Sequence, residues 1–518
     1  MPDAAVVSRA RRLRACAVLV LVGALLAAAG TGAPSAARPP VDATGLDTTG
    51  SGAVGGVGAG VGGTAVDVTA TDHARIALYQ QAVSVLPDGA RAEVPADALA
   101  VFLPGTRVPD PAAAVLAGAL GATPTTAAAL GPRAATQAAG AQRTWVAAGE
   151  VPGAGGPYEE LARAALLDLH SLTVAEGVVV AGWSEKWRYV WPRDSSFVAV
   201  ALARTGHLED ALAVLDFLAR VQEADGSFEA RYLPDGSGPP DDRGLQTDGT
   251  GWAMWAAGLV LAEAPADRRT ATAERLAPLV ERSAGRALAL VADGLPPASP
   301  DYWEVPEVEV TLGTAAPLVA GLEQAAVVLE AAGRPGPAAE AAAAAEGARR
   351  AVVDAFGATG YGRYATRGVP DAASAFVLTP FWSTAPHDAA AAWRASVTSM
   401  LRPARGLAPG GGWRRDGVSW TPQTTLYAWV AAEQGDVAGA LRWLDVVDRH
   451  RTSSGAIPEK VLADGSPAAV APLGWSAACV LLAIDALERA PPYGGPPARP
   501  GGGRATRRRR VTRRRRVT

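Results

Sequence analysis

Apolar residues recur at helical spacing over most of the chain after residue 158. In 208–223, Val214, Phe217, Leu218 and Val221 fall on one face of a helix. Similar runs occur at 158–170, 195–205, 250–263, 267–292, 313–332, 335–356, 388–402, 423–434, 436–449 and 472–489. Short turns with glycine or proline join many neighbouring runs, and strand-like alternation is scarce. The pattern predicts an all-α domain of helical hairpins over 151–490, arranged as an (α/α)6 barrel.

The pattern is weaker before this domain. Two segments, 75–86 and 98–108, have the composition of strands, and 112–122 has that of a short helix. We therefore expect 67–150 to form a small accessory segment, whose fold the sequence leaves open.

Both ends of the chain differ in composition from the helical domain. Arginines, an apolar stretch at 15–29 and the small residues Ser35-Ala36-Ala37 predict a cleaved signal peptide at 1–37 and a secreted protein. A Gly/Ala-rich linker follows at 38–66. The Pro/Gly/Arg-rich tail at 491–518 is typical of disordered sequence. No membrane span is expected in the mature chain.

Charge and reactive residues narrow the function further. The net charge is −3, but the first 37 residues carry +3 and the last 18 carry +9, which leaves the body at −15. An acidic body does not favour nucleic-acid binding. Only Cys479 remains in the mature chain, and the five histidines are scattered without metal-ligand spacing. We predict no metal, no cofactor and a monomer.

Four short polar and aromatic clusters lie at the ends of helical runs. Loops at one end of an α/α barrel converge, so these clusters are candidates for a single pocket. They are Val190-Trp191-Pro192-Arg193-Asp194, Gln246-Thr247-Asp248-Gly249-Thr250-Gly251-Trp252, Asp301-Tyr302-Trp303-Glu304 and Gly455-Ala456-Ile457-Pro458-Glu459-Lys460.

In this order, the clusters resemble the loops of glycoside hydrolase family 15, the glucoamylase family, which includes glucodextranases and some trehalases. The resemblance runs from about Leu161 to Leu487 and implies an inverting enzyme that releases glucose from non-reducing ends of α-glucans. It assigns the catalytic acid to Glu304 and the base to Glu459. The substrate-binding residues that it implies are Trp191, Arg193, Asp194, Gln246, Asp248, Trp252 and Trp303.

The residue types suit this chemistry. An inverting glycosidase needs a protonated carboxyl to donate a proton to the leaving oxygen, and a carboxylate that activates water on the opposite face. The apolar neighbours Tyr302 and Trp303 would keep Glu304 protonated, and Lys460 would favour ionised Glu459 if the side chains point together. One departure from the family is Val305-Pro306 after the acid, where relatives often have a second glutamate. It leaves Glu307 as a rival acid.

Plainer interpretations remain open for each residue. Asp194 could cap the following helix or pair with Arg193, Asp248 could cap a turn, and the two glutamates could be solvated loop residues. The functional interpretation is favoured because four motifs occur together. Within the family, a trehalase or an α-1,6-glucosidase is the alternative to an α-glucan hydrolase, and a non-catalytic sugar-binding protein is the alternative from another class. In each case the expected partner is a carbohydrate.

Overall fold

The computed structural model describes residues 73–98, 100–113 and 131–489, all of which belong to one compact unit, 69–518. The predicted signal peptide, linker and tail lie outside the described residues, as does most of the predicted helix at 112–122.

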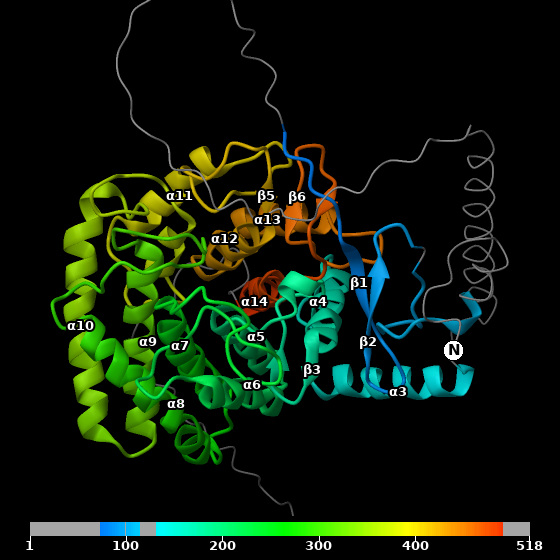
Figure 1. Cartoon of the computed structure of the whole chain (residues 1–518), viewed down its shortest axis with the longest axis horizontal. Helices are drawn as coiled ribbons and strands as arrows, with labels where there is room; N and C mark the ends of the chain where they lie inside the picture. The colour runs from blue at the N-terminus through cyan, green and yellow to red at the C-terminus, as the bar shows by residue number, and fades with distance from the viewer. Residues whose placement is uncertain (1–72, 99, 114–130, 490–518) are drawn as a thin grey trace, which may run out of the picture. The chain divides into compact units, whose positions relative to one another are not determined.

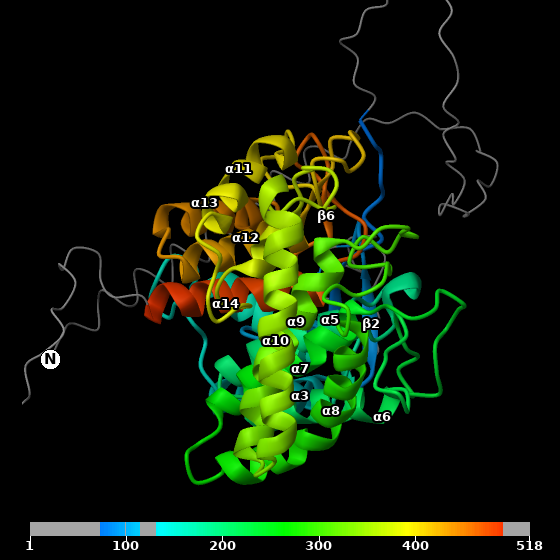
Figure 2. The same cartoon turned by 90° about the vertical axis from the view of Figure 1, so that its left-hand side faces the viewer.

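Within the described ranges, twelve helical elements form a ring of six hairpins, and eleven of them coincide with the runs that the hydrophobic pattern predicts (Figures 1 and 2). The inner elements, which contact one another around the barrel axis, are α5 (Pro192–Arg204), α7 (Asp248–Glu263), α9 (Leu312–Ala331), η4 (Ala372–Val377), α12 (Thr421–Glu433) and α14 (Gly474–Arg489). The outer helices are α4 (Glu159–Leu172), α6 (Leu208–Val221), α8 (Arg269–Leu290), α10 (Pro335–Phe356), α11 (Ala389–Met400) and α13 (Val437–Arg449). The (α/α)6 prediction is therefore confirmed.

Burial patterns explain which helices are inner and which are outer. Helix α12 is buried on every side from Thr421 to Ala432, whereas α13 buries one face, which includes Trp443 and Leu444. A helix that is buried on all sides lies within the core, whereas an amphipathic helix covers the core. Inner helices α7 and α9 pack closely through glycine: a Cβ on Gly251 would lie 2.3 Å from the Pro317 carbonyl oxygen.

The twelfth element is the one that the hydrophobic pattern does not reveal. It is η4, a 3-10 helix of six residues capped by the side chain of Asp371. Periodicity cannot identify so short an element, because it makes fewer than two turns of an α-helix.

The two ends of the barrel differ in the length of their connections. The connections from outer to inner elements are long and span 173–191, 222–247, 291–311, 357–371, 401–420 and 450–473. Four of the five in the other direction are short, at 205–207, 264–268, 332–334 and 434–436, and the fifth is 378–388. All four sequence clusters lie in the long connections or in the first turn of the inner helix that follows.

Small strands and 3-10 turns stiffen the long connections. They are β3 (Thr173–Ala175), β4 (Val178–Val179), η2 (Glu185–Trp187), η3 (Gly357–Thr359), β5 (Ser419–Trp420), β6 (Lys460–Val461) and β7 (Pro467–Ala468). Strands β5, β6 and β7 form one antiparallel sheet, with β6 in the centre.

The accessory segment contains an antiparallel hairpin and one helix. Strand β1 (Gln80–Val85) lies within the first predicted strand and pairs with β2 (Arg91–Pro95). The second predicted strand, 98–108, is wrong: its described residues form a turn around Gly105, whose φ is 68°. Helix α3 (Pro132–Ala148) is not predicted by the pattern, because its alanine-rich sequence gives little contrast between faces.

Helix α9 is long and apolar enough to span a membrane by length and composition, the one such helix among the described residues. Its most apolar window is 78% buried within the protein, and the helix is an inner element of the barrel. Burial in a large core accounts for this composition.

Candidate active site

Arg193 and Asp194 lie in the first turn of α5, where the long connection 173–191 enters the barrel. Both side chains are buried, and Nη2 of Arg193 lies 3.0 Å from Oδ2 of Asp194. The guanidinium also faces the ring of Trp475, at 4.8 Å from its centroid. The N-cap of α5 is Trp191, so Asp194 does not cap this helix.

Glu304 lies in the connection between α8 and α9 and has an unusual backbone. Its φ is 53°, in the left-handed region that residues other than glycine rarely adopt, and its N–H donates to the Asp301 carbonyl oxygen at 2.7 Å. Its Oε1 lies 3.3 Å from Nη2 of Arg193, and its Oε2 lies 2.5 Å from Nη1 of Arg243. Strained backbone of this kind is frequent at functional sites.

The surroundings of Glu304 differ from the apolar pocket expected from its neighbours. The Tyr302 hydroxyl donates to Asp371 and to the Pro409 carbonyl oxygen, and the ring of Trp303 lies under the guanidinium of Arg363, at 3.8 Å. Glu304 therefore contacts two cations and not two aromatic rings. The expectation was wrong because a tight turn directs adjacent side chains in different directions.

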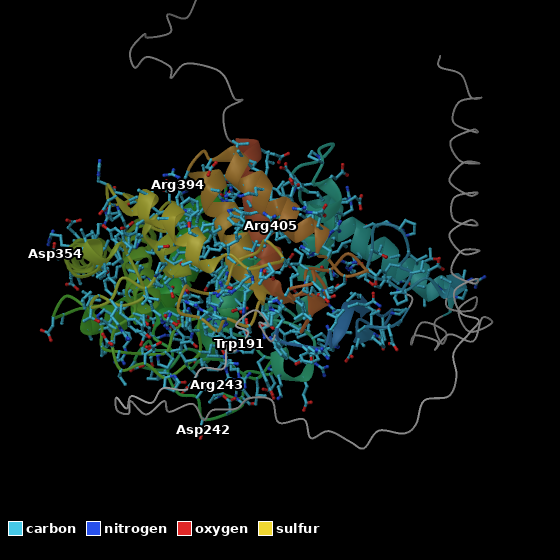
Figure 3. The ribbon with its side chains drawn as sticks, turned by 90° about the horizontal axis from the view of Figure 1, so that it is seen from above. Trp191, Asp242, Arg243, Asp354, Arg394 and Arg405 are labelled. Atoms are coloured by element: carbon cyan, nitrogen blue, oxygen red, sulfur yellow. The ribbon has the colours of Figure 1, made fainter. Side chains whose placement is uncertain are left out.

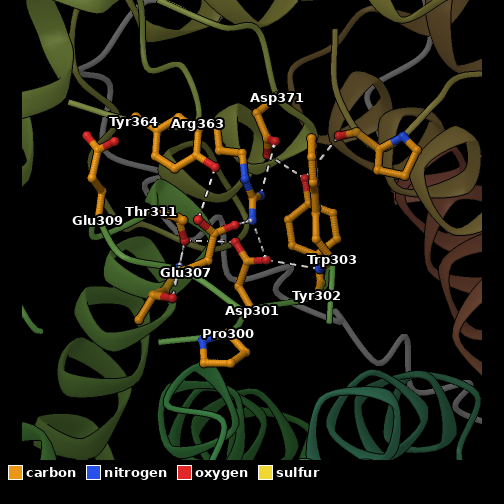
Figure 4. A network of polar contacts seen from close by, with 12 residues as sticks. Pro300, Asp301, Tyr302, Trp303, Glu307, Glu309, Thr311, Arg363, Tyr364 and Asp371 are labelled. Carbon is orange, nitrogen blue, oxygen red and sulfur yellow. Dashed lines mark hydrogen bonds and ion pairs between the residues drawn. The ribbon is translucent and has the colours of Figure 1, made fainter. Parts of the chain in front are cut away.

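A buried network around Arg363 holds the loop that carries Glu304 (Figure 4). Its Nη2 lies 2.9 Å from Oδ1 of Asp301 and 2.6 Å from Oε1 of Glu307, and its Nη1 lies 3.4 Å from Oδ2 of Asp371. Asp301 also accepts a hydrogen bond from Thr311, the N-cap of α9, at 2.7 Å. The network thus joins the loop to the starts of α9 and η4.

This network joins one guanidinium to three carboxyl groups, and the pKa values of Asp371 and Arg363 are shifted. Burial raises the pKa of Asp371 to about 6, although Arg363 opposes the rise. Burial alone would lower the pKa of Arg363, but the carboxylates of Asp301 and Asp371 raise it. Glu307, the rival acid, is bound on both oxygens, since Tyr364 donates to Oε2 at 3.0 Å and Arg363 contacts Oε1. The structure gives Glu307 a role in holding the loop.

Glu459 lies in the connection between α13 and α14, immediately before β6. Its N–H donates to the Val470 carbonyl oxygen at 2.8 Å, and its own carbonyl oxygen accepts from the Thr421 N–H at 3.0 Å. Nζ of Lys460 lies 3.4 Å from Oε2 of Glu459, so the two side chains do point together. Nε1 of Trp187 donates to Oε1 at 3.4 Å.

Asp248 and Gln246 come from the start of α7 and the loop before it. Burial raises the pKa of Asp248 to about 7, with Arg193 opposing the rise and Asp301 adding to it. The ring of Trp252 is buried among Phe197, Trp255 and other rings, and its Nε1 donates to Asp248 at 3.2 Å. Trp252 therefore supports Asp248 from the barrel core.

The structure brings these residues together at one end of the barrel. Burial raises the pKa of Asp194 to about 6; Arg193 opposes the rise, and the charges of Glu304 and Glu459 add to it. Asp194 thus lies within electrostatic range of both candidate catalytic glutamates. A narrow crevice beside it is lined by Trp191, Pro192, Arg193, Glu229, Ala230, Gln246, Asp248 and Gly249.

Several buried polar atoms around this crevice lack a hydrogen-bond partner among the described residues. They include Trp191 Nε1, Arg193 Nη1, Gln246 Oε1 and Asp248 Oδ1. Buried polar groups are normally paired, so a group of unpaired donors and acceptors is suited to a ligand rich in hydroxyls.

Three residues of this site are not identified by the sequence motifs. Arg363 belongs to no motif, and Trp187 lies just before the first cluster, outside it. Arg243 lies in the α6–α7 connection, where Asp241 pairs with it at 3.3 Å; seen from above, it lies in the same region as Trp191 (Figure 3). The sequence Asp241-Asp242-Arg243 resembles any charged surface loop, and only the fold brings it to Glu304.

Comparisons with known proteins bear on the fold. No family model matches the chain. The chain superimposes on a bacterial glucoamylase complexed with acarbose with a TM-score of 0.54 and 16% identity, over 67% of this chain and 57% of that one. It superimposes on a glucoamylase from Saccharomycopsis fibuligera with a TM-score of 0.51 and 13% identity, over 61% and 89%.

The chain has the glucoamylase fold. A wild-type glycosidase also shares this fold with a TM-score of 0.54 and 24% identity, over 64% of this chain and 97% of the glycosidase. An uncharacterized glycosyl hydrolase of Methanocaldococcus jannaschii is 34% identical over 98 residues, which is 18% of this chain and 16% of that protein. The match thus spans about a sixth of the curated relative's length.

Proposed function

We propose that this protein is an inverting glycoside hydrolase that releases glucose from the non-reducing ends of α-glucans or gluco-oligosaccharides. The observation that carries the proposal is that Glu304 and Glu459, 155 residues apart in sequence, both lie in long connections at the same end of the barrel, where Nη2 of Arg193 contacts both Asp194 and Glu304. Two glutamates at the end of the barrel that carries a buried Arg–Asp pair, on a glucoamylase fold, support glycosidic bond hydrolysis.

The contacts of each glutamate suggest which one is the acid and which one is the base. Trp187 donates to Oε1 of Glu459, and the Lys460 ammonium lies 3.4 Å from Oε2, so this carboxylate is held in place to act as the base that activates water. Glu304, which contacts Arg193, would donate its proton to the leaving oxygen. For inversion, the two carboxyl groups should stand about 6.5–9.5 Å apart, which leaves room for the water.

The remaining residues would hold the terminal sugar. Arg193 and Asp194 offer charged hydrogen-bonding groups, and Gln246 Oε1, Asp248 Oδ1 and the Trp191 indole N–H are unpaired around the same crevice. A glucose ring presents hydroxyls around its rim, so it could satisfy several of these atoms at once. Hydrogen bonds that tighten in the transition state would raise kcat.

The test is the release of glucose from soluble starch, isomaltose, dextran and trehalose. Proton NMR of fresh product identifies its anomer. We expect β-glucose first from an α-linked substrate, because water attacks from the face opposite the leaving group. Initial α-glucose would refute inversion.

The same panel separates the alternatives. Turnover of trehalose alone would identify a trehalase, and preference for isomaltose or dextran an α-1,6-glucosidase. Binding without turnover of any α-glucoside would favour a sugar-binding protein, which the retention of both glutamates argues against.

We also propose that the protein is exported and monomeric. The basic, apolar and small-residue segments at 1–37 support cleavage near Ala37. N-terminal sequencing and sedimentation of material from the culture medium test both points, and intact Met1 in the cytosol would contradict export.

A further inference from the structure

Residues 77–81, where the accessory segment enters its hairpin, run along the connection that carries Glu459. Leu78 forms a parallel bridge with Ala469. The Tyr79 N–H donates to the Ala469 carbonyl oxygen at 2.8 Å, and the Ala469 N–H donates to the Ala77 carbonyl oxygen at 2.9 Å. This short pairing joins two parts of the chain almost four hundred residues apart (from Leu78 to Ala469).

Gln80 extends the pairing with its side chain. Its Nε2 donates to the Ala471 carbonyl oxygen at 2.9 Å, and the residue is fully buried. Between the two held residues lies Val470, whose carbonyl oxygen accepts the N–H of Glu459. The backbone of Glu459 therefore hydrogen-bonds to a stretch that Tyr79 and Gln80 fix on either side.

Gln81 holds the opposite part of the same connection. Its Oε1 accepts from the hydroxyls of Ser453 and Ser454, and its carbonyl oxygen accepts from Thr452 Oγ1 at 2.7 Å. The side chain of Gln81 is anchored in turn by Nε2, which donates to the Pro95 carbonyl oxygen at the end of β2, at 2.9 Å. The connection is thus fixed both before and after Glu459.

The stretch next to Glu459 needs such support because its backbone is strained. Ala469 has a φ of 63°, in the left-handed region, which is unfavourable for alanine. A residue keeps this conformation only when the surrounding structure over-determines it. The two backbone hydrogen bonds to segment 77–79 supply that constraint.

Segment 77–81 also contacts the carboxylate of Glu459 indirectly, through Trp187. The ring of Tyr79 contacts the ring of Trp187, with 5.6 Å between centroids, and Trp187 donates to Oε1 of Glu459. Tyr79 is 45% exposed, so little else from the barrel encloses it. Segment 77–81 therefore acts on both the backbone and the side chain of Glu459.

We propose that Gln80 is a positioning residue for Glu459, and that segment 77–81 is part of the active site of the barrel and not a separate module. The inference rests on the proposed function, in which Glu459 is the base. A displacement of about 1 Å in a catalytic group can cost 10²-fold in rate. Loss of the Gln80 hydrogen bond should therefore act on turnover more than on binding.

The experiment compares full-length Gln80→Met, which keeps the side-chain volume but removes the donor, with the wild type and with Gln142→Met. Gln142 is an equally buried glutamine on α3 that accepts from the Arg107 N–H at 2.6 Å and does not contact 450–473 through its side chain. We expect Gln80→Met to lower kcat about 10- to 100-fold with KM changed less than about twofold. Gln142→Met should lose stability with kcat unchanged.

A chemical readout separates positioning from misfolding. Azide, a small anionic nucleophile, can attack the anomeric carbon from the face that Glu459 serves. The carbon–nitrogen bond forms as the carbon–oxygen bond breaks, and Glu304 protonates the leaving oxygen. Azide should restore part of the turnover of Gln80→Met and Glu459→Ala with formation of β-glucosyl azide, and should not rescue Glu304→Gln.

Two outcomes would overturn the inference. One is Gln80→Met with kcat within twofold of the wild type, and the other is a loss of activity that matches the loss of folded protein without azide rescue. Gln80→Leu, which also lacks the donor, gives a second measurement if Gln80→Met fails to fold. A wild-type protein without activity on any α-glucoside would refute the proposed function instead.

Discussion

Nη1 of Arg243 lies 2.5 Å from Oε2 of Glu304, so both oxygens of this carboxyl group are in contact with an arginine. Of the two arginines, Arg193 is buried, and Arg243 is 30% exposed on the α6–α7 connection. If Glu304 is the acid, as proposed, this ion pair occupies the oxygen that the leaving group would approach, and it would compete with substrate binding.

We therefore predict that Arg243→Ala lowers KM with little change in kcat. A partly exposed ion pair contributes roughly 0.2–1 kcal/mol, which corresponds to a decrease of about 1.5- to 5-fold. Steady-state kinetics on a short gluco-oligosaccharide measure the effect. Arg275→Ala, which removes a charge from an exposed pair on α8, is the control and should leave KM unchanged. A higher KM in Arg243→Ala would show that the guanidinium contacts substrate.

The two glutamates should respond differently to the leaving group. Glu304→Gln should slow cleavage of oligosaccharides about 10²- to 10⁴-fold, the usual contribution of a general acid, and should slow α-glucosyl fluoride much less. Fluoride leaves without protonation, so it does not need the acid. Glu459→Gln should slow both substrates, because each needs activated water. Glu307→Gln tests the rival acid: loss of oligosaccharide cleavage with retained fluoride turnover would reassign the role to Glu307.

Asp248 should make stability depend on pH. Its pKa rises from 3.8 in the unfolded chain to about 7 in the folded protein, chiefly through burial. Between these values the folded state binds more protons than the unfolded state, so the free energy of unfolding falls as pH rises through this window. Below the window both states are protonated and above it both are ionised, so this contribution is constant.

Asp248→Asn removes that titration. Its Tm relative to the wild type should therefore increase between about pH 5 and pH 7.5, on the order of a few degrees. Calorimetry at the two pH values measures the change. A Tm difference that is independent of pH would contradict the assignment.

Arg363 should be the most costly arginine to remove. It is the common partner of Asp301, Glu307 and Asp371, and it is 1% exposed. Removing one partner of a buried pair costs about 3–5 kcal/mol, because the remaining charge has no counterion. Urea denaturation should show this loss for Arg363→Met. Arg367→Met, which breaks an exposed pair with Glu309, should cost less than about 1 kcal/mol. Equal losses of stability in the two variants would show that Arg363 does not hold the buried network together.

Much of the barrel could be predicted from sequence because its helices follow the hydrophobic pattern. The failures have physical causes. Helix α3 has alanine on most faces, and η4 is too short for periodicity. Segment 98–108 has strand composition, but it turns at Pro104-Gly105 and is not a strand of the β1–β2 sheet.

The candidate site likewise contains residues that the sequence motifs identify and residues that they do not. Motif spacing suffices to select Arg193, Asp194 and the two glutamates, because each cluster is local. Arg243 and Arg363 are positioned by contacts across loops, which no local pattern encodes. Trp252 belongs to a motif, yet its ring faces the core, because position 252 lies on the inward side of α7.

The connections are long at one end of the barrel and short at the other. This difference separates the scaffold, which must stay constant, from the long connections, which can change. The helices and the short turns form the ring, whereas the six long connections and the helix starts that they enter supply the candidate chemical groups. Lengthening a surface connection costs little free energy, since closure entropy grows slowly with loop length. Evolution or design can therefore exchange one long connection for another and alter substrate preference while the twelve-element ring stays intact.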